Sequence, residues 1–307
     1  MSTPGNRPGG SGADSGGADS GSAGSGGSSR DGSHATPVTP SLLRGWPLPS
    51  AGADKYSRGA VMVIGGSRAM PGAVLLAGTL PEAGVLGLPE TKDGSVQGSG
   101  LEPIHEELQN ADAILVGPGL DNIVCTEELL RTLLRGDSEA GGSGTGDATI
   151  ILDAYALGCL PRLGDVLEPW RGRLILTPNP KEAGILLGRE ADQLESAVVA
   201  LAAQYQAVVN CQGIIARPQD AEYPEGPELW HITTGYGGLG TSGSGDVLAG
   251  AIAGLRARGT SDAQAVCWGT HLHAAAADRL AGRVGPLGFL ARELADELPG
   301  LMLELNT

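Results

Sequence analysis

The chain has 307 residues and a formal net charge of −15, and its few lysines and arginines form no basic stripe, which excludes nucleic acid as a partner. No apolar run approaches the length that spans a bilayer, and the N-terminus lacks the charged-then-apolar pattern of a signal peptide, so we expect no membrane partner. The four cysteines are far apart and fit no metal-site spacing, which favours free thiols in a cytoplasmic protein.

The start of the chain is rich in Gly, Ser, Asp and Ala. A segment of that composition buries too little apolar surface to offset the entropy lost on ordering. We therefore predict a disordered Gly/Ser-rich tail over residues 1–50 and one folded domain over residues 51–307. A second Gly/Ser-rich patch, residues 136–147, predicts a surface loop.

Short apolar runs alternate with helical periodicity through the rest of the chain. The predicted strands are residues 60–64, 113–116, 149–152, 174–176, 207–209 and 230–233. The predicted helices are residues 126–134, 181–187, 191–204, 247–258 and 263–280. This alternation indicates an α/β fold, with a parallel sheet covered by helices on both faces. Ligands of such sheets bind beyond the carboxyl ends of the strands, so the turns that follow the strands are expected to line one crevice.

The segment Thr241–Asp246, TSGSGD, enters the helix predicted from residue 247. The first N–H groups of a helix have no partner within the helix, and together with the helix dipole they favour an anion. Gly243 and Gly245 would let the backbone approach that anion closely. Asp246 adds a carboxylate that could accept a proton from a hydroxyl attacking a phosphoryl group. The alternative is a Gly/Ser turn in which Asp246 serves as an N-cap.

Other features carry weaker signals. Asp153 follows a predicted strand and is either a ligand contact or a helix cap. His271 and His273 lie two apart on a helix, face different sides and make a poor metal pair, so we interpret them as core or surface residues. Gly250 and Gly254 lie four apart on an apolar helix and indicate close helix packing.

Several segments, in order, resemble the ADP/ATP-dependent NAD(P)H-hydrate dehydratases of the ribokinase-like superfamily. The matching stretches are residues 55–59, 61–67, 71–78, 114–120, 151–157, 176–188, 241–259 and 270–281. GSGDVLAG and TPNPKEA are the most specific of them. The resemblance covers about residues 54–305 and implies a ribokinase-like three-layer αβα sandwich with a central, mostly parallel sheet.

The resemblance implies repair of hydrated NADH or NADPH (NADHX, NADPHX), with ADP or ATP as co-substrate and Mg²⁺. It implies that Asp246 is the catalytic carboxylate and contacts the substrate hydroxyl. The other substrate-binding residues it implies are Ala73, Gly119, Asp121 and Asn179. The nucleotide-binding residues it implies are Gln212, Gly213, Ile214, Ile215, Ala216, Gly243, Ser244 and Gly245. No metal-ligating residue is assigned, a homo-oligomer is the usual outcome for such enzymes, and the companion epimerase is expected to be a separate protein.

The chain departs from the family pattern at three places. No convincing strand is found between residues 79 and 109, so about one βα element of the family pattern is missing there. Gln212 stands where a lysine is usual, and Asp121 replaces a glycine. Two alternatives to the dehydratase stay open. One is a ribokinase-like small-molecule kinase, and the other is a nucleotide-binding pseudoenzyme without turnover.

Overall fold

The structure is a computed structural model that describes residues 35–50, 58–78, 84–138, 144–219, 228–235 and 237–306. Its strands are β1 (Thr36–Val38), β2 (Val61–Ile64), β3 (Ala113–Val116), β4 (Thr149–Leu152), β5 (Leu174–Leu176), β6 (Ala207–Cys211), β7 (Ile214–Arg217) and β8 (Glu228–Ile232). Its α-helices are α1 (Pro40–Gly45), α2 (Pro71–Gly78), α3 (His105–Asn110), α4 (Ile123–Ser138), α5 (Leu160–Leu163), α6 (Pro180–Leu187), α7 (Leu194–Tyr205), α8 (Ser244–Ala257), α9 (Asp262–Val284) and α10 (Ala291–Asn306). Three 3₁₀ helices complete the described elements: η2 (Glu102–Ile104), η3 (Ala154–Cys159) and η4 (Gly164–Trp170).

The strands form one sheet in the order β1-β8-β7-β6-β5-β4-β3-β2. Only β7 runs antiparallel to its neighbours in this sheet, so the prediction of a mostly parallel sheet is confirmed. The six predicted strands are present, with shifted ends at β2, β6 and β8. Strands β1 and β7 were not predicted, because each is short and has no long apolar run.

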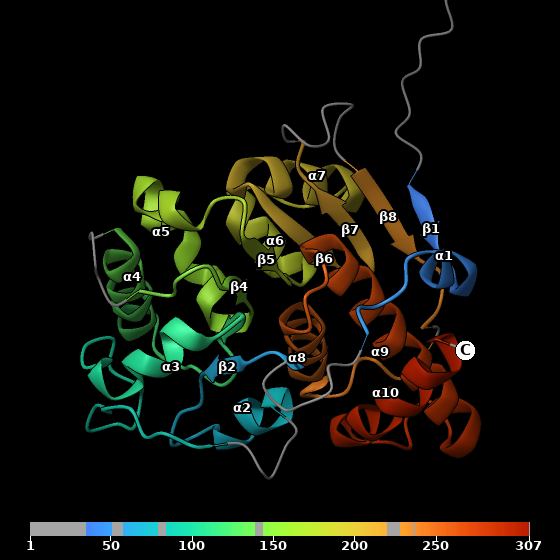
Figure 1. The fold of residues 1–307 in the computed structure, drawn as a ribbon, viewed down its shortest axis with the longest axis horizontal. Coiled ribbons are helices and arrows are strands. Elements are labelled where there is room, and N and C mark those ends of the chain that lie inside the picture. Colours follow the sequence, from blue (N-terminus) through green and yellow to red (C-terminus); the bar gives the residue numbers. More distant parts are fainter. Residues whose placement is uncertain are drawn as a thin grey trace, which may run out of the picture. The chain divides into compact units, whose positions relative to one another are not determined.

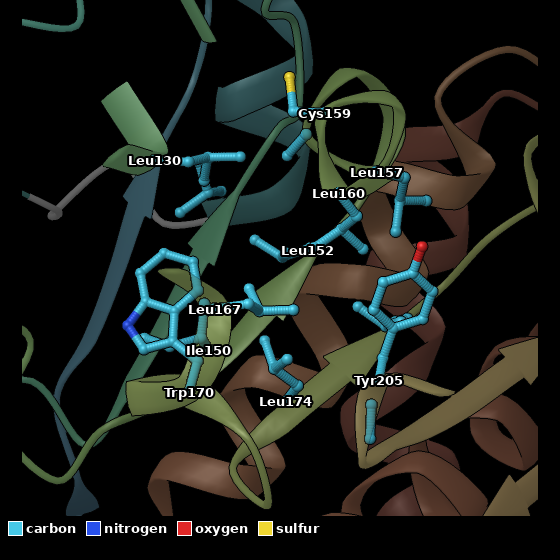
Figure 2. Packing of buried hydrophobic residues seen from close by; sticks show 14 of the residues in the cluster. Leu130, Ile150, Leu152, Leu157, Cys159, Leu160, Leu167, Trp170, Leu174 and Tyr205 are labelled. Carbon is cyan, nitrogen blue, oxygen red and sulfur yellow. The ribbon is translucent and has the colours of Figure 1, made fainter. Parts of the chain in front are cut away.

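Successive residues of the central strands point to opposite faces of the sheet, and each face has its own core. Ile114, Ile150 and Leu174 pack under α4, α7 and the 3₁₀ segments. Figure 2 shows part of this first core, in which Trp170 and Leu167 lie beside Leu130 and Ile150. Residues of the opposite parity pack against α8, α9 and α10. Figure 1 shows helices on both sides of the sheet, which confirms the three-layer αβα prediction.

Part of the predicted tail belongs to the sheet. β1 pairs with β8 in parallel, Leu43 is fully buried, and the Trp46 ring stacks on Trp230 with 6.3 Å between ring centroids. The prediction of disorder is therefore wrong for residues 36–46. The prediction rested on the average composition of a Gly/Ser-rich segment. That average does not register the few apolar side chains, such as Leu43 and Trp46, that pack in the core. Residues 1–34 lie outside the described residues, and for them the tail stays a prediction.

The segment after α2 adds no strand to the sheet within the described residues 84–112. It forms only isolated bridges, Ser67 with Ser95 and Glu90 with Val96. β2 is consequently the last strand at its end of the sheet, and Val61 on it is 43% exposed. Residues 79–83, where the family element was expected to begin, lie outside the described part of the chain.

The two glycines of α8 differ in their surroundings. A Cβ added to Gly250 would run into the backbone carbonyl of Ala77 on α2, whereas a Cβ on Gly254 would meet nothing within 4 Å. We expect Gly250→Ala to lower the free energy of unfolding by about 1–3 kcal/mol, because the two helix backbones must separate. Gly254→Ala, the matched control, should raise it by about 0.5–1 kcal/mol through helix propensity. Urea unfolding of both variants measures the difference, and equal shifts would contradict close α2–α8 packing.

Candidate active site

The carboxyl ends of five strands are in register. Ile64, Val116, Leu152, Leu176 and Val209 form one row across β2, β3, β4, β5 and β6. The residues that follow this row are Gly65, Gly117, Asp153, Thr177 and Asn210. Backbone hydrogen bonds continue across part of this second row, from the Gly117 N–H to the Ile64 carbonyl and from the Asp153 N–H to the Val116 carbonyl, both at 3.1 Å. These strand ends therefore share one edge of the sheet, and the crevice that they were expected to line stays a prediction.

Helix α8 begins at this edge with two backbone donors available. Gly243 has the left-handed φ of +87° and caps the helix without a side-chain hydrogen bond. The Ser244 N–H donates to the Thr241 carbonyl at 3.2 Å, and the Val247 N–H donates to the Gly243 carbonyl at 3.2 Å. Among the described residues, the N–H groups of Gly245 and Asp246 between them have no acceptor. This helix start therefore offers adjacent donors to an anion, as expected from the sequence.

Asp246 lies half-buried in the first turn of α8. Burial, together with a smaller effect from the negative charge of nearby Asp153, raises the pKa of its carboxyl to about 6. A carboxylate with a pKa near 6 can hold or release a proton at neutral pH, which is the property required of a general base. The side chain does not act as the N-cap of α8, because Gly243 occupies that position.

Asp153 directly follows β4 and is buried, with 6% of its surface exposed. It stands at the N-cap position of η3 but makes no side-chain capping bond there. The Thr177 hydroxyl donates to its carboxylate at 2.8 Å. Burial raises the pKa of Asp153, although hydrogen bonds from Thr177 and the Ala154 backbone act in the opposite direction. The structure thus places a second carboxyl group beside Asp246.

Asn179 caps α6 rather than presenting a free carbonyl oxygen. Its Oδ1 accepts from the N–H groups of Lys181 at 2.9 Å and Glu182 at 3.0 Å, and the Glu182 carboxylate accepts from the Asn179 N–H at 2.8 Å. This reciprocal pattern is a capping box. Burial raises the pKa of Glu182, and the charge of Asp153 raises it as well, so Glu182 lies near the carboxylate pair.

Ala73 and Gly119 are brought together at the β2–β3 side of the edge. A Cβ on Gly119, whose φ is +74°, would lie 3.1 Å from the Ala73 Cβ and 2.6 Å from the Met70 carbonyl oxygen. Asp121 follows two residues later, and its Oδ1 is buried without a hydrogen-bond partner among the described residues. Leu76 of α2 reaches the α8 start, since its Cδ1 would be 2.6 Å from a Cβ on Gly243.

The predicted nucleotide segment 212–216 divides between a turn and a strand. Gln212 and Gly213 form the β6–β7 turn with φ values of +50° and +81°, and the Gly213 N–H donates to Asn210 Oδ1 at 3.2 Å. This turn lies at the carboxyl edge. Ile215 and Ala216, by contrast, are fully buried within β7. The structure therefore does not bring those two side chains to the edge, because the hairpin carries them back into the core.

The comparisons with known proteins agree with this geometry. A family model described as NAD(P)H-hydrate dehydratase matches residues 95–300. The chain belongs to the NAD(P)H-hydrate dehydratase family. It is 36% identical over 303 residues to the ADP-dependent (S)-NAD(P)H-hydrate dehydratase of Xanthomonas campestris, covering 88% of this chain and 97% of that protein. It is 32% identical to the bifunctional NAD(P)H-hydrate repair enzyme Nnr of Moorella thermoacetica, covering 85% of this chain and about half of that protein, 52%.

Solved structures of dehydratase-family and ribokinase-like proteins share the fold. The ADP/ATP-dependent NAD(P)H-hydrate dehydratase of Bacillus subtilis, co-crystallised with ATP and Mg²⁺, has a TM-score of 0.64 at 25% identity and covers 88% of this chain and 99% of that one. A ribokinase-like superfamily protein from Enterococcus faecalis has a TM-score of 0.69 at 20% identity over 88% of this chain and 96% of that one. The predicted ribokinase-like fold is confirmed.

Sequence reasoning about this dehydratase-family chain missed two residues of the site. Glu182 was quoted only as part of a motif, although its spacing from Asn179 is that of a capping box. His273 was interpreted as a core or surface residue. It is buried, and its Nε2 lies 3.2 Å from the Ser244 hydroxyl at the start of α8. No local sequence signal links His273 to Ser244, because the two residues are 29 positions apart.

Three further observations concern the described part of the chain. A groove of about 820 Å³ lies between α4 and η4, where Val124 and Val166 are among its lining residues, and none of the predicted site residues lines it. Within the described ranges, no three potential His, Cys, Asp or Glu ligands gather as a metal site. No helix in the same ranges is both long and apolar enough to cross a membrane.

Proposed function

We propose that the protein is an ADP-dependent (S)-NAD(P)H-hydrate dehydratase, which restores NADH or NADPH from the hydrated forms. One observation carries the proposal. The α8 start combines two N–H groups that have no acceptor within the described ranges with a half-buried carboxylate, Asp246, whose pKa is about 6. The 36% identity to the Xanthomonas campestris enzyme over nearly its whole length supports the same activity.

The proposed reaction makes a leaving group and then expels it. Asp246 accepts the proton of the hydroxyl on the hydrated nicotinamide ring. The hydroxyl oxygen forms a bond to the terminal phosphorus of ADP, and the bond between that phosphorus and the AMP oxygen breaks. The N–H groups of Gly245 and Asp246 stabilise charge on the transferred phosphoryl oxygens. The lone pair of the ring nitrogen then expels phosphate, and loss of a proton from the adjacent ring carbon restores the dihydronicotinamide. The products are NAD(P)H, AMP and phosphate.

Mg²⁺ is proposed to arrive with the nucleotide. This ion usually keeps several waters and is held by one or two carboxylates together with substrate phosphates. Asp153, which lies near Asp246, and Glu182, which lies near Asp153, supply oxygen donors of that kind. ATP is a second candidate phosphoryl donor, because the Bacillus subtilis relative was co-crystallised with ATP and Mg²⁺.

The remaining site assignments are also proposals. Ala73, Gly119 and Asp121 would contact NADHX or NADPHX at the β2–β3 side of the edge. Exposed Asn179 would contribute its side-chain amide N–H groups, since its carbonyl oxygen caps α6. At the other side, the β6–β7 turn residues Gln212 and Gly213, with half-buried Ile214, would contact AMP.

We also propose the setting in which the enzyme works. Its four cysteines, all within the described residues, are free thiols, which supports a reducing cytoplasm. A homo-oligomer is proposed from the general tendency of such enzymes to form symmetric assemblies. We propose that a separate protein supplies the epimerase activity that would convert the other epimer of the hydrate.

The activity is tested by incubating the protein with hydrated NADH, Mg²⁺ and either ADP or ATP. Absorbance of the reduced nicotinamide should recover with ADP. The absence of recovery with both nucleotides would reject the proposal. Accumulation of a stable phosphorylated metabolite in a product screen would instead identify a small-molecule kinase of the same fold.

The pH dependence follows from the raised pKa of Asp246. Because the base must be ionised, kcat/KM should rise through about pH 6 and level off at higher pH. Asp153→Asn removes the neighbouring charge and should move the midpoint to lower pH. Asp165→Asn, which removes an exposed carboxylate from η4, should leave the midpoint unchanged. The midpoints are measured from pH–rate profiles of the wild type and the two variants. The same midpoint in all three would show that Asp153 does not affect the pKa of Asp246.

A further inference from the structure

Polar side chains of helix α9 contact several segments at the carboxyl edge of the sheet. Asn210 of β6 donates from Nδ2 to the Thr270 hydroxyl at 3.0 Å. The His271 Nδ1 lies 3.5 Å from the Thr234 hydroxyl in the segment after β8, and the His273 Nε2 lies 3.2 Å from the Ser244 hydroxyl. One rigid helix therefore touches the strand that leads into the proposed AMP turn, the segment after β8 and the first residue of α8.

The contact between His273 and Ser244 is the most enclosed of these. The two residues are 4% and 5% exposed. Burial lowers the pKa of His273 to about 4. The imidazole is consequently neutral at physiological pH, with one nitrogen that donates and one that accepts a hydrogen bond. A buried imidazole without a partner would cost free energy, so this ring fixes the position of the group it contacts.

Ser244 in turn sets the geometry of the donors beside it. It is the first residue of α8, and Gly245 and Asp246 follow it directly. Its own N–H is satisfied by Thr241. A change in the position of Ser244 would tilt the two free N–H groups and the Asp246 carboxylate together. Gly243 has no side chain with which to fix this turn, so the contact from α9 supplies the missing constraint.

We propose that His273 is a positioning residue for the phosphoryl transfer, which acts through Ser244 to aim the free N–H groups of α8 at the transferred phosphate. This inference rests on the proposed function and adds a residue that has no contact with substrate. A histidine that served only core packing would affect stability and leave turnover of the folded enzyme unchanged.

The test compares His273→Leu, which cannot form the hydrogen bond, with His273→Gln, whose amide can donate or accept at a similar position. We expect His273→Leu to lower kcat about 10- to 100-fold, the usual effect of losing a group that orients a functional residue. Ser244→Ala should have a similar effect, and the double variant should be no worse than either single one within about 3-fold, because both changes break the same contact. His273→Gln should recover most of the activity.

His271→Leu is the matched control. It lies on the same helix, is equally buried at 3% exposed, and contacts Thr234 instead of Ser244. It should lower the melting temperature about as much as His273→Leu while kcat stays within about 3-fold of the wild type. Equal losses of kcat in the two leucine variants, or independent effects of His273→Leu and Ser244→Ala, would overturn the proposal. If His273→Leu does not fold, the proposal is tested by the other two variants. It then requires a lower kcat in Ser244→Ala and nearly wild-type activity in His273→Gln.

Calorimetric affinity for ADP with Mg²⁺ separates this inference from the proposed function. If the wild type binds ADP but shows no dehydration, the proposed function fails. The positioning role is then judged by binding alone. About 10-fold weaker ADP binding by His273→Leu and Ser244→Ala, but not by His271→Leu, supports it. Unchanged affinity in all three variants contradicts it.

Discussion

Asp246→Asn is expected to lower kcat about 10²- to 10⁴-fold, the contribution typical of a general base. The amide keeps the size of the side chain but cannot accept the proton of the ring hydroxyl. Calorimetric affinity for ADP should be nearly unchanged, because the N–H groups at the α8 start remain in place. Steady-state kinetics on hydrated NADH measure the loss, and a variant with normal turnover would remove Asp246 from the mechanism.

The same substitution should not destabilise the protein. A carboxyl whose pKa is raised from 3.8 to about 6 in the folded state binds its proton more tightly there than in the unfolded chain. Its contribution to stability is therefore fully present below about pH 4 and is lost as pH rises through about 6. Above that pH, Asp246→Asn removes an unfavourable buried charge, so its melting temperature should equal or exceed that of the wild type. Reduced activity with reduced stability would indicate a general loss of structure.

Asp137→Ala is expected to cause the largest loss of stability. The Asp137 carboxylate, 5% exposed, accepts from Trp170 Nε1 at 2.6 Å, from the Thr145 hydroxyl at 2.6 Å and from Arg173 Nη2 at 2.8 Å. Removing it leaves a largely buried guanidinium and a buried indole N–H without this acceptor. Breaking such a pair costs about 3–5 kcal/mol, which lowers the melting temperature of a domain of this size by roughly 10 °C.

Glu90→Ala is the control for this loss. Glu90 pairs with Arg68, but the two side chains are 50% and 60% exposed. Exposed pairs contribute about 0–1 kcal/mol, so thermal unfolding of this variant should shift by no more than about 3 °C. If Asp137→Ala and Glu90→Ala shift the unfolding equally, the buried network around Asp137 does not hold the loop before β4 to the first core.

Sequence reasoning predicted the sheet because its central strands are short, apolar on both faces and followed by turn residues. It placed Asp246 and the ends of β2 to β5 at one edge for the same reason. It missed β1, whose few apolar residues lie next to a Gly/Ser-rich stretch. It also assigned Ile215 and Ala216 to nucleotide binding from a motif match, which could not show that their side chains are buried within β7.

The long-range contacts and the electrostatics of the site could not be predicted from local sequence. The coupling of Asp246 to Asp153 and the contact of Ser244 with His273 join residues that are distant in sequence and meet only through the register of the strands and the packing of α9 on α8. The cap on α6 is the opposite case. The spacing of Asn179 and Glu182 is a capping box that the sequence carries openly, so it could have been predicted.

Product stoichiometry tests the central claim most directly. The wild-type protein is mixed with hydrated NADH, ADP and Mg²⁺, and NADH, AMP and phosphate are quantified together by absorbance and chromatography. The mechanism predicts one AMP and one phosphate for each NADH restored. ADP consumption without recovery of NADH, or NADH recovery without AMP, would contradict a phosphoryl transfer at the α8 start with Asp246 as the base.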